Sequence, residues 1–231
     1  AGSDIYRVRQ LVTERLTALA GRLPQGVLPP AMTALTSALD EGRRAALVNT
    51  VWQENDRSFD ATLRRLDEIV VREPMSQADL LGRHEMSSRV HLDLSYYAEI
   101  AEDAPVTDWS KQIVVTDFHY REHDFWYRVT RGPLAQRTYF DMRDHSWSSL
   151  VKSLRTCRLV VTGRHHAVYA ACVARRPFVA MTGNTHKIEG LIAASGFPIP
   201  VVTSVREASK TLHWALDNRG MYKEFFHWMD E

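Results

Sequence analysis

The stretch between Cys157 and Val202 constrains the fold more than any other part of this chain. It holds three short apolar runs typical of buried parallel strands, separated by two segments rich in helix-forming residues. The runs are Arg158–Thr162, Phe178–Met181 and Ile199–Thr203, and the helical segments are Ala167–Val173 and Lys187–Ala194. This alternation predicts a doubly wound α/β domain built on a parallel sheet.

Polar residues gather just after the first two of these strands. Arg164, His165 and His166 follow the first, and the segment from Asn184 to Lys187 follows the second. In open α/β sheets, ligands bind outside the carboxyl ends of the strands, and both clusters also begin helices, whose N-terminal N–H groups attract anions. One Arg, one Lys and three His therefore converge on one edge, which indicates a phosphate or carboxylate site. Alternatively, the residues of both clusters are ordinary solvated loop residues without a ligand. The occurrence of two such clusters at consecutive strand ends argues against this alternative.

The first half of the chain offers similar candidates. Ala45–Thr50 predicts a strand, and Asn49 and Gln53 at its carboxyl end are candidate contacts to an acceptor. An ordinary strand-to-helix loop explains them equally well. Glu68–Val71 predicts a second strand that delivers Arg72 to the same edge. A surface pair with a neighbouring glutamate is the alternative for Arg72, and its place at a strand end favours a ligand role.

The chain divides into two α/β domains, residues 1–105 and 106–231, around an acidic, proline-containing segment at Glu102–Pro105. We expect two Rossmann-like domains facing each other across a cleft. Helical periodicity covers Ile5–Ala20 and Ala31–Ala38, so we expect helices there rather than an opening strand and a Gly-rich loop. A long helical region is expected over Val205–Met229.

Composition excludes several classes of protein. The 29 Lys and Arg nearly balance the 28 Asp and Glu, for a formal net charge of +1. No basic block with interleaved aromatics appears, which argues against nucleic-acid binding. Neither a secretory signal nor a long apolar span is present, so we expect a cytoplasmic protein without a membrane span. Cys157 and Cys172 fall in or beside predicted buried elements and are expected to be core thiols.

Several kinds of active site are also disfavoured. His119, His123 and Asp124 have the residue types of a metal site, but no Cys joins them and the surrounding aromatics favour a packed lid, so no metal site is predicted. The sequence has no G-x-S-x-G elbow, and neither a G-x-G-x-x-G nor a P-loop motif occurs. Hydrolase chemistry, dinucleotide binding and P-loop binding are therefore not expected.

Four segments together resemble the polysaccharide pyruvyl transferase family. Gly163–His166 resembles its R-x-H element, and Asn184–Gly190 resembles its HK-x-x-G element one strand later. Val71–Ser76 is similar to its V-R-(acidic)-x-x-S segment, and His91–Ser95 to its D-L segment. The resemblance covers roughly residues 45 to 205, and the order and spacing of the segments make it more specific than any motif alone.

The resemblance implies a two-Rossmann-domain fold, similar to GT-B-like glycosyltransferases. It also implies transfer of the pyruvyl skeleton of phosphoenolpyruvate onto two sugar hydroxyls as a ketal. Phosphoenolpyruvate is then the donor substrate, and no separate cofactor is expected. The acceptor is a saccharide or a lipid-linked oligosaccharide. The candidate site residues are His166 and Arg164 for catalysis, Arg72, His165, Asn184, His186 and Lys187 for donor binding, and Asn49 and Gln53 for acceptor binding.

Two other functions stay open at this point. A glycosyltransferase on the same architecture would use the cationic edge for the phosphates of a nucleotide-activated, acidic sugar. The other alternative is a binding domain that has this fold but no catalytic activity. The sequence predicts neither the acceptor sugar nor the oligomeric state.

Overall fold

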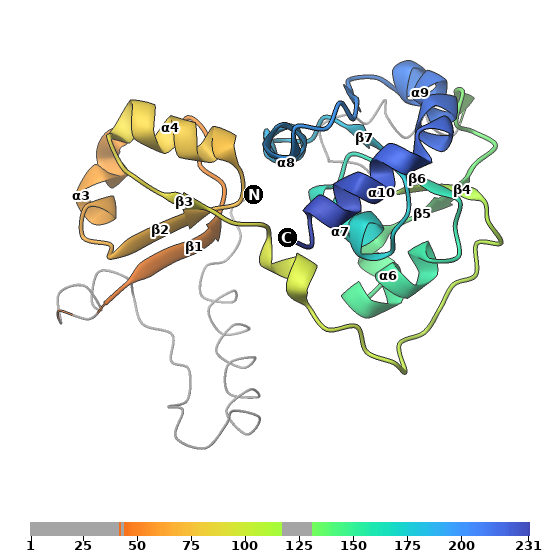
Figure 1. Ribbon diagram of the computed structural model, residues 1–231, viewed down its shortest axis with the longest axis horizontal. Helices are drawn as coiled ribbons and strands as arrows, with labels where there is room; N and C mark the ends of the chain where they lie inside the picture. The colour runs from red at the N-terminus through yellow and green to blue at the C-terminus, as the bar shows by residue number, and fades with distance from the viewer. Residues whose placement is uncertain (1–41, 43, 117–130) are drawn as a thin grey trace. The chain divides into compact units, whose positions relative to one another are not determined.

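A computed structural model describes residues 42, 44–116 and 131–231 (Figure 1). The helices expected at 5–20 and 31–38, and the cluster of His119, His123 and Asp124, lie outside these residues. The chain forms two compact units, residues 1–46 with 60–68 and residues 47–59 with 69–231. The site considered below belongs entirely to the second unit. The expected division into domains 1–105 and 106–231 stays a prediction.

A five-stranded sheet dominates the second unit, and all four of its neighbouring strand pairs are parallel. Its order is β5-β4-β6-β7-β8, so the chain runs from β4 outward to β5 and then returns to the other side of β4. This is a doubly wound order, in which the crevice beside the reversal is the usual ligand site. The strands are β4 (Ile113–Thr116), β5 (Thr138–Phe140), β6 (Leu159–Thr162), β7 (Phe178–Met181) and β8 (Val201–Val202).

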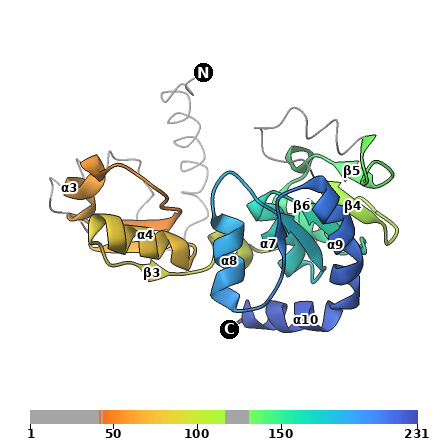
Figure 2. The same cartoon turned by 90° about the horizontal axis from the view of Figure 1, so that it is seen from above.

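Helices cover the sheet, and Figure 2 shows α8 and α9 on opposite sides of its strands. Every residue of β6 and β7 is buried, as expected for the centre of a parallel sheet covered on both faces. Cys157 and Cys172 are both buried and free, which confirms the expected core thiols. The helices are α6 (Trp147–Leu154), α7 (His165–Val173), α8 (Lys187–Ser195), α9 (Val205–Asp217) and α10 (Arg219–Trp228).

The C-terminal helical region is not continuous. It breaks at Asn218, whose backbone N and side-chain Nδ2 both donate to the carbonyl of Trp214, at 3.0 and 2.8 Å. Asparagine commonly ends helices in this way because its amide competes for backbone partners. The last strand is also shorter than expected, because Pro198 and Pro200 lack the N–H that would extend its pairing.

A smaller sheet has the order β1-β2-β3, formed by β1 (Ala46–Thr50), β2 (Glu68–Val71) and β3 (Arg89–Val90), with β2 and β3 parallel. A 3₁₀ turn at Arg57–Phe59 and the short α3 (Asp60–Leu63) lie between β1 and β2. The α4 helix (Pro74–His84) follows β2, and a 3₁₀ turn at Leu94–Tyr97 follows β3. The fold is therefore a mixed α/β fold with parallel sheets, as the sequence predicted.

The start of α4 is fixed by a capping residue and a proline. Glu73 is its N-cap, and the Glu73 carboxylate accepts hydrogen bonds from the backbone N of Met75 (2.8 Å) and of Ser76 (3.1 Å). Pro74 occupies the first helical position, where its missing N–H has no cost. The Ser76 hydroxyl does not cap the helix, and this frees it for the contacts described below.

Candidate functional site

A pocket of about 460 Å³ lies at the carboxyl ends of β5, β6 and β7. We call it the strand-end pocket. Five of the predicted site residues line it: the catalytic candidates Arg164 and His166, and the donor-binding candidates His165, Asn184 and Lys187. The two polar clusters that follow consecutive strands thus meet at one edge of the sheet, as their positions in the sequence indicated.

Two buried threonines hold the segment before α7 in place. Thr116 at the end of β4 donates its hydroxyl to the Thr162 oxygen at 2.8 Å. Thr162 also accepts from the backbone N of Arg164 at 2.9 Å. Both threonines are 0% exposed, so these hydrogen bonds are shielded from water. The result is a fixed turn that places Arg164 at the N-cap of α7 and starts the helix at His165.

The neighbouring histidines His165 and His166 have opposite environments. The His165 side chain is buried against Tyr169, with ring centroids 4.8 Å apart, whereas the His166 side chain is 54% exposed. Burial, with a smaller contribution from the nearby His166, lowers the pKa of His165 to about 3. His165 is therefore neutral at physiological pH and adds no positive charge to the pocket. Of this pair, His166 is the one that solvent and a ligand can reach.

Asp93 connects Arg72 to His166. Its Oδ2 lies 2.7 Å from Nη1 of Arg72 and 3.6 Å from Nε2 of His166. Its Oδ1 accepts from the Ser95 backbone N at 2.9 Å, and its own backbone N donates to the Tyr169 hydroxyl at 3.2 Å. Burial alone would raise the pKa of Asp93, but His166, the Ser95 N–H and the Arg72 charge hold it well below its ordinary range. Asp93 is thus a buried carboxylate that stays charged.

Arg72 is held on its other side by Asn49. Its Nε donates to the Asn49 carbonyl at 2.7 Å, and the Asn49 side-chain Oδ1 accepts from the Leu94 backbone N at 3.2 Å. Asn49 has a φ of 55°, a left-handed conformation that asparagine tolerates better than most residues. Asn49 and Arg72 therefore fix the position of Asp93 together, Asn49 through the backbone of Leu94 and Arg72 through the Asp93 carboxylate. Arg72 pairs with Asp93 rather than with the neighbouring glutamates considered from the sequence.

A second network joins the start of α4 to the start of α8. His186 Nε2 lies 3.1 Å from Glu73 Oε1 and 3.2 Å from Ser76 Oγ. The Ser76 hydroxyl donates to Glu73 and accepts from the Trp52 backbone N, the latter at 2.8 Å. Gly190 completes the contact, because a Cβ at this position would overlap the Glu73 carboxylate. His186 thus lies in a packed polar network and outside the described lining of the strand-end pocket.

The remaining predicted residues have distinct roles. The Gln53 Oε1 accepts from the backbone N of His186 at 3.2 Å, which ties the loop after β1 to the N-cap of α8. Burial and, secondarily, the charge of Arg72 lower the pKa of Lys187. At the pocket mouth, Arg143 binds Asp141 through Nε at 3.0 Å, and this contact helps to hold the pKa of Asp141 at about 2.

Asp93, His165 and His166 are a conceivable metal site. Their potential ligand atoms lie within 4.8 Å of one another. However, the Arg72 guanidinium already lies 2.7 Å from the same Asp93 oxygen. A divalent cation at that oxygen would face repulsion from Arg72, and the electrostatics therefore favour the arginine as the positive partner of Asp93.

Asp93, Glu73 and Ser76 were not singled out as site residues from the sequence. All three lie within the segments that resemble the pyruvyl transferase family, so their polar side chains were the available signal. Part of their roles depends on partners far away in the chain, since 72 positions separate Asp93 from His165 and 113 separate Glu73 from His186. Residue type and local spacing could not supply those pairings.

Three comparisons with known proteins bear on this site. A family model described as polysaccharide pyruvyl transferase matches residues 50–185, which include Arg72, Asp93 and the Arg164–His166 segment. No curated protein matches the chain.

Among solved structures, the glycotransferase of kitacinnamycin is similar, with a TM-score of 0.50 and 10% identity over 84% of this chain and 68% of that one. Spinosyn rhamnosyltransferase SpnG, complexed with thymidine diphosphate, has a TM-score of 0.51 and 11% identity over 85% of this chain and 65% of that one. The chain thus spans about two thirds of the length of these structures. At such low identity, the likeness concerns the fold alone.

Proposed function

The chain belongs to the polysaccharide pyruvyl transferase family, and on that premise we propose that it transfers a pyruvyl group from phosphoenolpyruvate to two hydroxyls of a sugar in a polysaccharide or its lipid-linked precursor. The observation that carries the proposal is the strand-end pocket, where Arg164 and Lys187 supply positive charge beside the reachable imidazole of His166. A donor with a phosphate and a carboxylate close together suits such a pocket.

The reaction requires two protons to be moved. One sugar oxygen bonds to C2 of the donor, a proton adds to the methylene carbon, the bond from C2 to the phosphate oxygen breaks, and a second sugar oxygen bonds to the same carbon. The two hydroxyl protons end on the new methyl group and on the released phosphate. A solvent-facing side chain that can both accept and donate a proton suits this transfer, and the imidazole of His166 is such a group.

Asp93 acts in this scheme as a positioning residue. Its carboxylate lies 2.7 Å from Nη1 of Arg72 and 3.6 Å from Nε2 of His166, so it orients both the guanidinium and the imidazole. The neutral, buried His165 also lies beside this carboxylate, with its Nδ1 3.9 Å from Asp93 Oδ2. Arg72 would then reach the donor from beside the pocket, with Asn49 and Asp93 fixing its side chain.

The test is to measure donor binding and turnover separately. Replacing His166→Ala should keep phosphoenolpyruvate binding but lower turnover roughly a hundredfold to ten-thousandfold, the usual contribution of general acid–base catalysis. Arg164→Ala should instead weaken donor binding, measured by titration calorimetry. His213→Ala, at an exposed histidine on α9, is the matched control and should change neither. Near-normal turnover in a folded His166→Ala protein would remove His166 from the mechanism.

A glycosyltransferase is the second candidate, and the similarity in fold to SpnG, which was solved with thymidine diphosphate, supports it. In that case the strand-end pocket would hold the phosphates of a nucleotide sugar. Melting temperatures distinguish the two. Phosphoenolpyruvate alone should raise the melting temperature of a pyruvyl transferase, whereas a rise with nucleotide sugars and none with phosphoenolpyruvate would favour the glycosyltransferase.

A further inference from the structure

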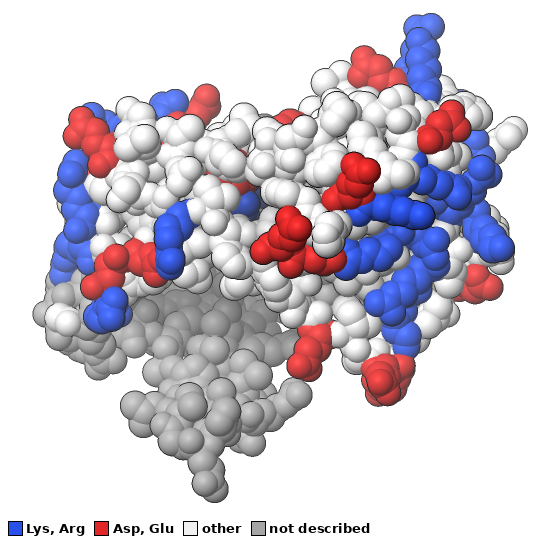
Figure 3. All heavy atoms as spheres, in the orientation of Figure 1, with Lys and Arg blue, Asp and Glu red and all other residues white. Residues whose placement is uncertain are grey.

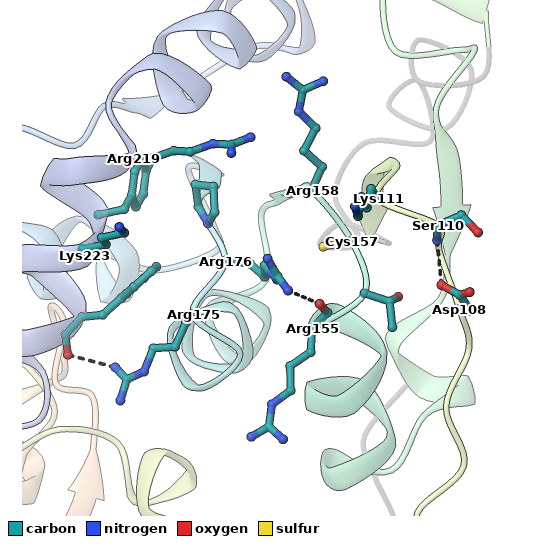
Figure 4. A pocket seen from close by; sticks show the side chains of 14 residues that line it. Asp108, Ser110, Lys111, Arg155, Cys157, Arg158, Arg175, Arg176, Arg219 and Lys223 are labelled. Carbon is teal, nitrogen blue, oxygen red and sulfur yellow. Dashed lines mark hydrogen bonds between the residues drawn. The ribbon is translucent and has the colours of Figure 1, made fainter.

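A second hollow lies at the opposite edge of the five-stranded sheet, at the amino ends of its strands. It has a volume of about 1070 Å³ and is bounded by the segments that precede β4, β6 and β7 and by one face of α10. Figure 4 shows Arg219 and Lys223 on the α10 side and Arg158 and Lys111 on the strand side. We call it the basic hollow. None of its lining residues belongs to the strand-end pocket.

Positive charge is concentrated here. Seven of the fourteen lining residues are Lys or Arg and one, Asp108, is acidic, although the whole chain has a formal net charge of only +1. Figure 3 shows Lys and Arg gathered on the right of the view, in the region of α10. Within the described part of the chain, only Arg175 of these seven forms an ion pair, with Asp230 at 2.8 Å. The other six cations therefore lack carboxylate partners among the described residues.

The backbone at the basic hollow is strained. Ser110, Lys111 and Arg175 have φ values of 46°, 61° and 57°, in the left-handed region. Such conformations cost on the order of 1 kcal/mol or more for residues other than glycine, and they concentrate at functional sites. Glycine would adopt them freely, yet two of the three positions carry cationic side chains. Lys111 and Arg175 thus carry cationic side chains at positions where glycine would cost less.

The lining indicates the kind of ligand. Tyr222 and Phe226 are 1% and 4% exposed, so neither offers an open ring on which a base or a neutral sugar could stack. Recognition of a ligand in the basic hollow must therefore rest on charge. Six cations without carboxylate partners among the described residues are more than one phosphate or carboxylate needs, which indicates a ligand with several negative charges. Five of the seven cations are Arg, whose planar guanidinium binds carboxylates through paired hydrogen bonds. A hollow of this volume also suits an inserted chain better than a flat lipid surface.

We propose that the basic hollow binds the carboxylates of an anionic saccharide chain, namely the part of the polymer that already carries pyruvyl ketals. The identity of this chain rests on the proposed function, because each transfer leaves one carboxylate on the modified sugar. A polymer with repeated ketals is then a polyanion, and the enzyme holds it at a second place away from the strand-end pocket. Already modified chains are therefore retained while further sugars react.

The experiment uses oligogalacturonate, a saccharide chain with one carboxylate per sugar, and its fully methyl-esterified form, which has the same chain without the charges. Titration calorimetry with the full chain at low salt should detect binding of the acid form only. Arg219→Gln with Lys223→Gln should weaken that binding about tenfold, which corresponds to about 1.4 kcal/mol for the two lost charge contacts together. The control is Arg206→Gln with Lys210→Gln, the same residue types at the same spacing near the start of α9, which should bind normally.

Three results would overturn the proposal: no binding of oligogalacturonate, equal binding of the methyl ester, or equal losses in the two double variants. Binding instead to vesicles of phosphatidylglycerol and phosphatidylcholine, abolished by Arg219→Gln with Lys223→Gln, would assign the hollow to a membrane surface. The binding assay needs no turnover, so the two proposals can fail separately. Oligogalacturonate binding without any pyruvyl transfer would reject the proposed function alone, and transfer without oligogalacturonate binding would reject the basic hollow alone.

Discussion

Replacing Gly190→Ala is the sharpest test of the packing around the candidate site. An alanine Cβ would overlap Oε2 of Glu73 and lie 2.8 Å from both Cδ and Cγ of that side chain. The Glu73 side chain is 1% exposed and cannot swing into solvent without leaving its partners, which are the N–H groups of Met75 and Ser76, the Ser76 hydroxyl and His186. The added methyl group must therefore displace a buried carboxylate.

The magnitude follows from the contacts that are lost. Losing an N-cap costs about 1 kcal/mol, and losing a hydrogen bond to a buried charged group costs roughly 1.5–3 kcal/mol. Alanine is better than glycine within a helix by about 1 kcal/mol, which offsets part of this loss. The net expectation is a destabilisation of about 2 kcal/mol. For a chain of this length, that lowers the melting temperature by roughly 4–8 °C.

Thermal and urea unfolding followed by circular dichroism measure the effect. Gly82→Ala on α4 and Gly220→Ala on α10 are matched controls, because a Cβ at either helical position meets nothing within 4 Å. Both controls should be neutral or slightly stabilising. In a Glu73→Ala background, Gly190→Ala should lose its cost, since the clashing carboxylate is gone. If Gly190→Ala is as stable as the controls, the Glu73–Gly190 contact is wrong.

Two further predictions concern charge. Because burial lowers the folded pKa of His165 to about 3 from an ordinary 6.5, the unfolded chain binds more protons between these values, and stability falls as pH drops through this window. Urea unfolding measures the free energy of unfolding at pH 7.5 and at pH 5. Between these two pH values, His165→Gln should lose about 2 kcal/mol less of this free energy than the wild type does. Equal losses in the two proteins would contradict a neutral, buried His165. Asp93→Asn should destabilise the protein by about 3 kcal/mol, because it leaves the mostly buried Arg72 unpaired. Asp141→Asn, next to the exposed Arg143, should cost less than 1 kcal/mol, and similar losses in the two variants would refute the special role of Asp93.

Local patterns in the sequence determined the fold class and one edge of the site. Apolar runs bounded by turn residues predicted β2, β6 and β7 to within one residue, because buried parallel strands are apolar throughout. The same alternation placed Arg164, His166, Asn184 and Lys187 at consecutive strand ends, and parallel strands must bring those ends to one edge. Their lining of a single pocket therefore follows from topology.

Tertiary structure alone decided which polar groups are charged, which are buried and which contact one another. His165 and His166 are adjacent and chemically identical in the sequence, yet burial makes one neutral and leaves the other in solvent. The role of Asp93 depends on Arg72 and His166, which meet it only in the folded chain. The basic hollow likewise gathers Lys111, Arg158 and Arg219 from distant segments, which no local pattern marks. Periodicity reports burial along one element, whereas electrostatics depends on distances between elements, and only the fold sets those distances.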